Sequence, residues 1–208
     1  MLREFYKKEM KEDLRLYTGS QYLQFGGRAK GYVFFESPDF LNGDIQYDNK
    51  LYTDVKMRYD LEKDEIVVDS YTENYPIKLI AERVGYFTLD NHLFTRFVPD
   101  SSTGNAARPG FFDKIYSAKN ISAFVKREKK LEMPVNTEDN VPEYKQYDSY
   151  YILLNGKSYK VENTSSVAGI LNDKRSLVRK FIRSSHFARK KITDEMLKEI
   201  LTYYTNLK

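Results

Sequence analysis

The chain of 208 residues has no cysteine, no tryptophan and only two histidines. Without cysteine it has no disulfide, no thiolate metal site and no cysteine nucleophile. His92 and His186 lie far apart in the sequence and match no metal-binding spacing such as HExxH. No run approaches the roughly 18 apolar residues of a membrane-spanning helix. We therefore expect no metal ion, no cofactor and no transmembrane segment.

Catalytic motifs are also scarce. The sequence has no G-x-S-x-G nucleophile elbow, and Gly26-Gly27 lacks the further glycines, lysine and hydroxyl residue of a phosphate-binding loop. Only Asp54, Asp60 and Asp64 offer carboxylates that could meet at the end of one hairpin, which keeps a carboxylate-based hydrolase as an alternative. The sequence predicts no catalytic residue, and we expect that the protein is not an enzyme.

Aromatic residues, by contrast, are abundant, with 18 tyrosines and 13 phenylalanines. They fall in short runs of alternating polarity, which are typical of strands with one buried and one wet face. The clearest run is 51–61, where Leu51, Thr53 and every second residue after them are expected to face the core. Asp90-Asn91 is predicted as a two-residue turn between two strands, because both residues tolerate the left-handed conformation.

The stretch 147–162 gives the strongest structural signal. Asn155-Gly156 supplies the two positive φ angles of a type I′ turn, so the flanking runs of Tyr, Ile, Leu and Val are expected to pair as a hairpin. Helical periodicity follows it. Asn163 to Ser166 offer capping oxygens for one helix, and Thr193 is expected to cap the last one.

Together these patterns predict an α+β fold in one domain. We expect an antiparallel β-meander of eight to ten strands, forming a curved sheet or partial barrel, followed by two or three C-terminal helices. A flat two-layer sandwich is the alternative. The expected boundaries are an N-terminal helix over 1–16, an antiparallel β domain over 17–162, and a helical segment over 163–208 packed on the sheet.

The formal net charge of +4 is distributed unevenly. Residues 173–208 carry ten Lys/Arg and four Asp/Glu, so this segment alone has a net charge of +6. A local basic face suits phosphates, acidic lipid head groups or an acidic protein, although a solvated outer helix face would look the same. The predicted partner-binding residues are Arg175, Arg179, Arg183, Arg189, Lys190 and Lys191.

Several short motifs lie along the chain. They are Leu16-Tyr17-Thr18-Gly19, Gly43-Asp44-Ile45-Gln46-Tyr47, Tyr59-Asp60-Leu61 with Asp64, Gly110-Phe111-Phe112 and Tyr203-Tyr204-Thr205-Asn206-Leu207. Together they resemble an uncharacterised family of small exported proteins of Bacteroidota-type bacteria. The resemblance extends over most of the chain. It implies a periplasmic or envelope-associated location after removal of a signal peptide, and it implies no activity. A cytoplasmic location is the alternative.

The leading hypothesis from the sequence is a non-enzymatic, envelope-associated binding or accessory protein. It would contact another protein or an apolar ligand, and its basic tail would meet an acidic surface, including peripheral contact with a membrane. The alternative is a cytosolic nucleic-acid-binding module that uses the same arginines. No RNA- or DNA-binding signature supports that alternative, so nucleic acid is the less favoured partner.

Overall fold

The computed structural model describes residues 14–24, 27–70, 74–97, 109–133, 141–188 and 190–207. Most of the range 1–16, for which a helix is predicted, lies outside these residues, and the described chain begins with the short 3-10 helix η1 (Leu14–Tyr17). The chain divides into two compact units, and each is described by itself. Unit 1 comprises residues 1–96 and 128–147, and unit 2 comprises residues 97–127 and 148–208.

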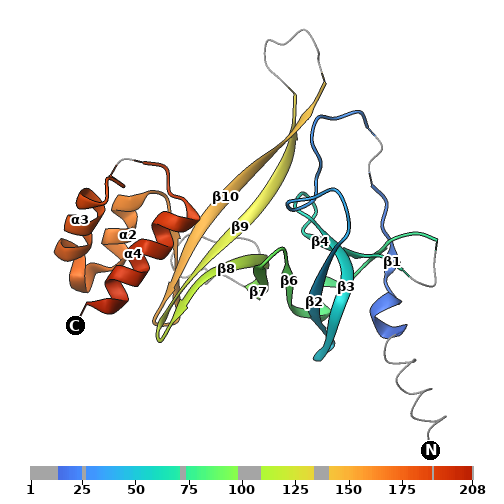
Figure 1. The fold of residues 1–208 in the computed structure, drawn as a ribbon, viewed down its shortest axis with the longest axis horizontal. Coiled ribbons are helices and arrows are strands. Elements are labelled where there is room, and N and C mark those ends of the chain that lie inside the picture. Colours follow the sequence, from blue (N-terminus) through green and yellow to red (C-terminus); the bar gives the residue numbers. More distant parts are fainter. Residues whose placement is uncertain are drawn as a thin grey trace, which may run out of the picture. The chain divides into compact units, whose positions relative to one another are not determined.

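Unit 1 is an antiparallel array whose strand order is β1-β5-β4-β3-β2-β6-β7 (Figure 1). Its order departs from a simple meander, because β2 lies between β3 and β6. The strands are β1 (Ser20–Gln21), β2 (Leu41–Tyr47), β3 (Lys50–Asp60), β4 (Glu65–Val68), β5 (Ile77–Lys78), β6 (Val84–Leu89) and β7 (His92–Phe97), with the 3-10 helix η2 (Ala81–Arg83) before β6.

Two tight turns fix the register of unit 1. Asp90 and Asn91 have φ angles of 47° and 63°, which confirms the predicted turn between β6 and β7. Asp48 and Asn49 have φ angles of 50° and 62° between β2 and β3. Positive φ at both central residues is the type I′ geometry, whose twist matches that of the paired strands.

A β-bulge interrupts β3 and corrects the predicted face of that strand. The pairing changes from Gly43↔Val55 to Ile45↔Tyr52, so β3 has one more residue than β2 between these two pairs. Asp54 takes the left-handed conformation, with a φ of 56°. The extra residue reverses which side chains point inward. Leu51 is therefore 50% exposed and Tyr52 only 9% exposed, so the prediction that Leu51 faces the core was wrong.

Unit 2 contains the strand order β8-β9-β10-β11, followed by three α-helices. Strands β9 and β10 each also run into unit 1. Asn155 and Gly156 have φ angles of 51° and 80° between β10 and β11, which confirms the predicted type I′ hairpin. The elements are β8 (Gly110–Ala118), β9 (Ile121–Glu132), β10 (Glu143–Leu154), β11 (Lys157–Val161), α2 (Thr164–Ile170), the 3-10 helix η4 (Asn172–Lys174), α3 (Arg175–Ser184) and α4 (Asp194–Asn206).

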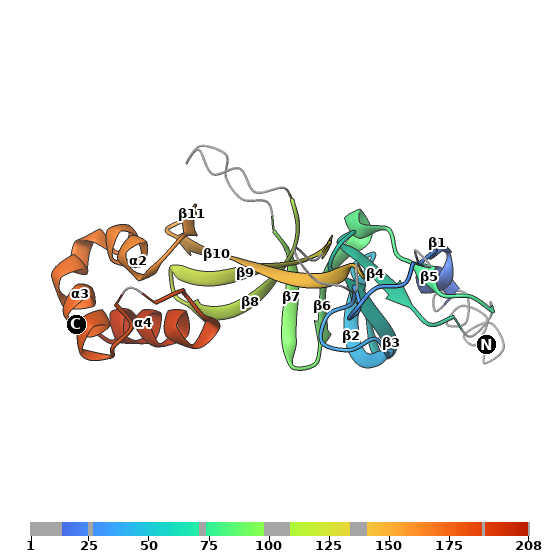
Figure 2. The same cartoon turned by 90° about the horizontal axis from the view of Figure 1, so that it is seen from above.

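The helices form one core with the strands of unit 2. Asn163 and Ser166 form a capping box at the start of α2, and the Thr193 hydroxyl accepts a bond from the Met196 amide at the start of α4. The core combines strand and helix residues, among them Ile152, Val178 and Leu201. Figures 1 and 2 both show α3 beside α2 and α4.

The described residues contain eleven strands, which is more than the eight to ten strands predicted from the sequence. The strand order is open, with β1 and β11 at its two edges. Two of the eleven, β1 and β5, have only two residues each, which is too short to show a periodicity. Antiparallel strands followed by helices are the architecture that the sequence predicted.

Candidate binding surface on the helical segment

A buried arginine anchors the last helix. Arg127 of β9 is 6% exposed, and its guanidinium reaches carboxylates from three other elements. It donates to Asp113 of β8 at 2.9 and 2.5 Å, to Asp148 of β10 at 3.1 Å, and to Asp194 of α4 at 2.6 Å. The Tyr150 hydroxyl donates to the other Asp194 oxygen at 2.9 Å. One side chain therefore joins three strands to the first turn of α4.

The ionisation of this cluster follows from its burial. Burial alone would lower the pKa of Arg127, but the carboxylates of Asp113 and Asp194 outweigh that effect and raise it. Burial, and then the neighbouring Asp194 carboxylate, raise the pKa of Tyr150 well above its ordinary value. The cation stays charged and the phenol stays neutral, so the cluster serves as a fixed support for α4 and offers no group poised for proton transfer.

The outer side of α3 is basic. Each fourth residue of a helix advances only about 40° around its axis, so Arg175, Arg179 and Arg183 lie along one side. Lys180 extends the cationic surface, and all four side chains are exposed. Val178 and Ile182 of the same helix are buried and hold it to the core. We call these four exposed residues the basic face of α3.

No acidic residue within α3 balances the positive charge of its basic face. The helix contains no Asp or Glu. Among the residues that the structure describes, no carboxylate forms an ion pair with any of its four cations, whereas Arg83, Arg127 and Lys78 all have one. Four positive charges in ten residues repel one another, so an acidic partner would relieve an existing electrostatic cost.

The six predicted partner-binding residues do not all lie together. Arg175, Arg179 and Arg183 share the basic face of α3, as described above. Lys190 and Lys191 are exposed in the connection between α3 and α4, after the chain has turned at His186, where φ is 58°. Arg189 lies outside the described residues. Lys180, which is not one of the six, is also exposed on this helix, one residue after Arg179.

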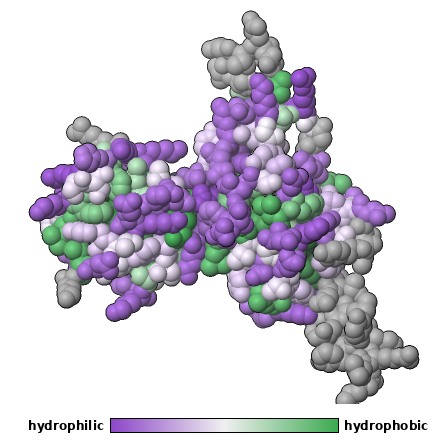
Figure 3. All heavy atoms as spheres, viewed as in Figure 1, coloured by the Kyte–Doolittle hydropathy of each residue, from purple (hydrophilic) through white to green (hydrophobic). Residues whose placement is uncertain are grey.

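A shallow hollow of about 380 Å³ opens between α3 and α4. The rings of Phe181 and Tyr203 stack at its wall with centroids 4.3 Å apart and planes 8° from parallel. Figure 3 shows apolar residues reaching the surface over the helices, between hydrophilic ones. This hollow could not be predicted from the sequence, because its residues come from two helices. It is lined by Phe181, Lys198, Glu199, Thr202, Tyr203 and Asn206.

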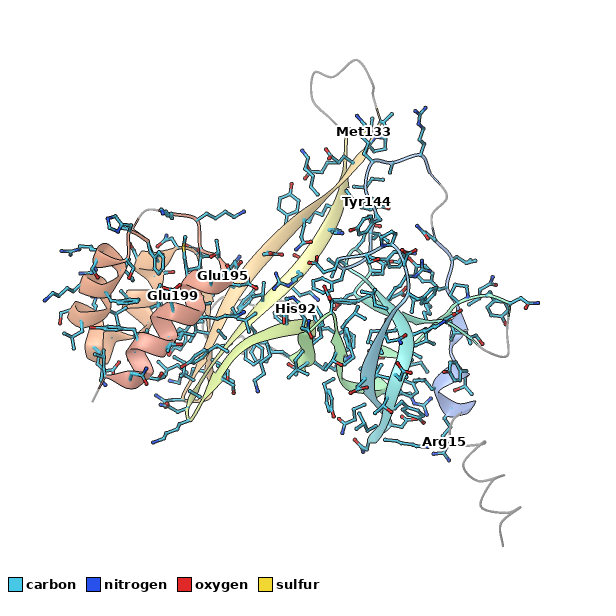
Figure 4. The ribbon with its side chains drawn as sticks, in the orientation of Figure 1. Arg15, His92, Met133, Tyr144, Glu195 and Glu199 are labelled. Carbon is cyan, nitrogen blue, oxygen red and sulfur yellow. The ribbon has the colours of Figure 1, made fainter. Side chains whose placement is uncertain are left out.

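A second, polar hollow of about 590 Å³ lies in unit 1, around the bulge in β3. Asp44, Asp54 and Asp90 line it together with His92, which stands at the start of β7 (Figure 4). Within the described residues, no group of three or more His, Asp or Glu side chains is placed to hold a metal ion. The hollow therefore has polar walls without the convergent ligands of a metal centre.

The three carboxylates named for a hydrolase do not meet in this hollow. Asp54 lines it, but Asp60 is six residues further along β3, which corresponds to roughly 20 Å of extended strand. Asp60 is fully buried and accepts bonds from the Tyr22 hydroxyl at 2.7 Å and from the amides of Glu62 and Lys63 at 2.9 and 3.0 Å. The Asp60 carboxylate therefore has a structural role as a hydrogen-bond acceptor.

Comparison of the chain with protein-family models, curated proteins and solved structures finds no match. Of the helices in the described residues, none has the length and apolar character needed to cross a membrane. The candidate site therefore rests on its own geometry.

Proposed function

We propose that the protein is a non-enzymatic binding protein of the cell envelope, which holds an acidic partner protein against the basic face of α3. The observation that carries this proposal is the set of four exposed cations on one ten-residue helix, without a paired carboxylate among the described residues. Arginines can bind carboxylates with two parallel hydrogen bonds, which adds geometric specificity to charge attraction.

A protein partner is favoured over single-stranded nucleic acid by the state of the nearby aromatic rings. Binding of unpaired bases relies on aromatic faces beside the cations. Phe181 is half-buried, stacked on Tyr203 and in edge contact with Phe187, so one face of its ring is covered and not available to a base. Leu177 is 44% exposed on the same helix and suits an apolar contact with a protein.

The envelope location in this proposal comes from the resemblance to exported proteins. An acidic protein at the envelope meets the same chemical requirement as any other carboxylate-rich surface, so binding and location are separate parts of the proposal. Location is tested by fractionating cells that express the native gene and finding where the protein accumulates. Recovery in the cytoplasm would contradict the envelope assignment and leave the binding surface intact.

The binding surface is tested by fluorescence anisotropy with a labelled peptide of glutamate and glycine. The variant Arg175→Glu/Arg179→Glu/Arg183→Glu is expected to bind the peptide roughly tenfold more weakly, because three charge pairs are lost and replaced by repulsions. A matched control is Lys119→Glu/Lys157→Glu/Lys160→Glu, which makes the same change of net charge at exposed lysines outside α3. The control is expected to stay within about twofold of the wild-type affinity.

Two further probes separate the partner classes. A single-stranded oligonucleotide and vesicles containing anionic phospholipid are titrated under the same conditions. Tighter binding of the oligonucleotide than of the peptide, with a steep dependence on salt, would replace the proposed function with the nucleic-acid alternative. An equal loss of peptide binding in the α3 variant and in the control would show that only net charge matters.

A further inference from the structure

The hollow between α3 and α4 adjoins the basic face of α3. Leu177 precedes Phe181 by one helical turn, and Lys180 lies three residues beyond Leu177, so these side chains are neighbours on the helix surface. Phe181 belongs to the wall of the hollow. A partner segment that reaches Lys180 can therefore cover Leu177 and enter the hollow.

The wall of the hollow is already ordered for a contact. Phe181 packs against the core of unit 2 and holds the Tyr203 ring by stacking. Tyr203 is half-exposed, and its hydroxyl makes no hydrogen bond to another residue that the structure describes. A rigid aromatic surface with a free polar tip loses little conformational entropy on binding, which is typical of residues that dominate interface energies.

Charges of both signs lie around the hollow. Lys198 of α4 lines it and is exposed, and Lys180 of α3 is exposed one residue before Phe181 of its wall. Glu195 and Glu199 lie one turn apart on α4 (Figure 4), and Glu199 itself lines the hollow. Carboxylates of a partner are thus attracted toward α3 and Lys198 and repelled near Glu199, so the charge pattern restricts how an acidic segment can lie.

We infer that this hollow receives an apolar anchor side chain of the acidic partner, either aromatic or leucine, flanked by carboxylates that contact α3. The inference rests on the proposed function and specifies the chemistry of its partner. The volume of about 380 Å³ is sufficient for one large side chain. Apolar burial there supplies affinity, while the basic face of α3 selects acidic sequences.

The test uses two short peptides of glutamate and glycine, one with a central phenylalanine and the other with alanine at that position. The phenylalanine peptide is expected to bind the full-length protein about tenfold more tightly, because its ring is removed from water. Thr202→Trp, which fills the hollow from an exposed position, is expected to abolish that difference and leave the alanine peptide unaffected. Ser165→Trp, exposed on α2, is the matched control and is expected to preserve the difference.

The charge pattern gives a second readout that does not depend on filling the hollow. Glu199→Lys is expected to tighten binding of both peptides severalfold, because it removes the repulsive group. Equal affinities of the two peptides for the wild-type protein would overturn the inference about the hollow and leave the proposed function standing. Absence of binding by either peptide would overturn both.

Discussion

Unit 1 buries an aspartate that accepts hydrogen bonds from a phenol and two backbone amides, whereas unit 2 buries an arginine that faces three aspartates. Asp60 holds a turn and the Tyr22 segment within unit 1. Arg127 joins three strands and α4 within unit 2. Asp60 is satisfied by two amides of its own turn and by one distant phenol, whereas every carboxylate that faces Arg127 comes from another element of unit 2.

The same contrast extends to the overall charge of the units. The residues of unit 1 include 22 Asp/Glu and 17 Lys/Arg, and those of unit 2 include 8 Asp/Glu and 17 Lys/Arg. Unit 2 therefore carries the whole positive excess of the chain. Three of its few carboxylates, Asp113, Asp148 and Asp194, are turned inward to Arg127, which leaves the outer cations of α3 uncompensated.

The largest effect is expected from Arg127→Met. This change removes the cation that faces the buried Asp113 and leaves three carboxylates near one another, so unit 2 should lose about 3–5 kcal/mol of stability. Urea unfolding gives the magnitude, and hydrogen exchange of α4 and β8 amides identifies the unit affected. Arg127→Lys keeps the charge and is expected to cost less. Unchanged exchange in α4 would show that Arg127 does not hold that helix.

A smaller effect is expected from Asp60→Ala. The Tyr22 hydroxyl and the amides of Glu62 and Lys63 lose their acceptor, which should cost unit 1 about 1–3 kcal/mol. Asp60→Asn keeps one acceptor oxygen, so urea unfolding should place it between Ala and the wild type. If Asp60→Asn lowered the free energy of unfolding as much as Asp60→Ala, the negative charge of Asp60 would itself be needed. The contrast with Arg127 would then weaken.

The smallest effect concerns alkaline pH. Burial raises the pKa of Tyr22, and the hydrogen bond to Asp60 adds to it; burial and Asp194 do the same for Tyr150. Because the unfolded phenols ionise near pH 10, this stability is present below pH 10. It falls as the pH rises further, by at most about 1.4 kcal/mol per pH unit for each phenol.

Urea unfolding between pH 9 and 11 checks this dependence, with phenolate absorbance as a parallel signal. Tyr22→Phe should flatten the alkaline slope for unit 1, and Tyr150→Phe should flatten it for unit 2. The same variants at pH 7 report only the lost hydrogen bond and serve as the reference. A slope identical to that of the wild type in either variant would contradict the assignment for that tyrosine.

The features predicted best from the sequence are those set by neighbouring residues. Asn155-Gly156 and Asp90-Asn91 form their turns because the local φ angles require residues that tolerate positive values. Thr193 caps α4 for a similarly local reason. Such features can be predicted without knowing which other segment of the chain lies nearby.

The features missed depend on pairing between distant segments. The bulge at Asp54 is defined by its register against β2, and it reverses the inward face that simple alternation assigned to Leu51. Arg127 looked like any other charge at the end of a strand, since Asp113 and Asp194 are 14 and 67 residues away from it. Periodicity cannot report either contact.

For the candidate binding surface, helical spacing was sufficient to predict that three arginines share one side of a helix. It was not sufficient to predict the positions of the two lysines or the hollow. Arg175, Arg179 and Arg183 share a side because they lie in one helix. Lys190 and Lys191 follow the end of that helix, so their nearness in sequence did not place them on the same side. The hollow beside α3 needs the packing of α4, which the sequence does not specify.

The division of the chain has a practical consequence for dissecting the protein. Unit 1 consists of two separate stretches, 1–96 and 128–147, and unit 2 consists of 97–127 and 148–208. Neither is therefore a contiguous cassette that a single truncation, a proteolytic cut or a gene fusion could release. Separate expression of the basic unit would require its two stretches to be rejoined by a designed linker or a circular permutation. A truncation between residues 97 and 147 would remove residues of both units, so the loss of function that followed could not be assigned to one of them.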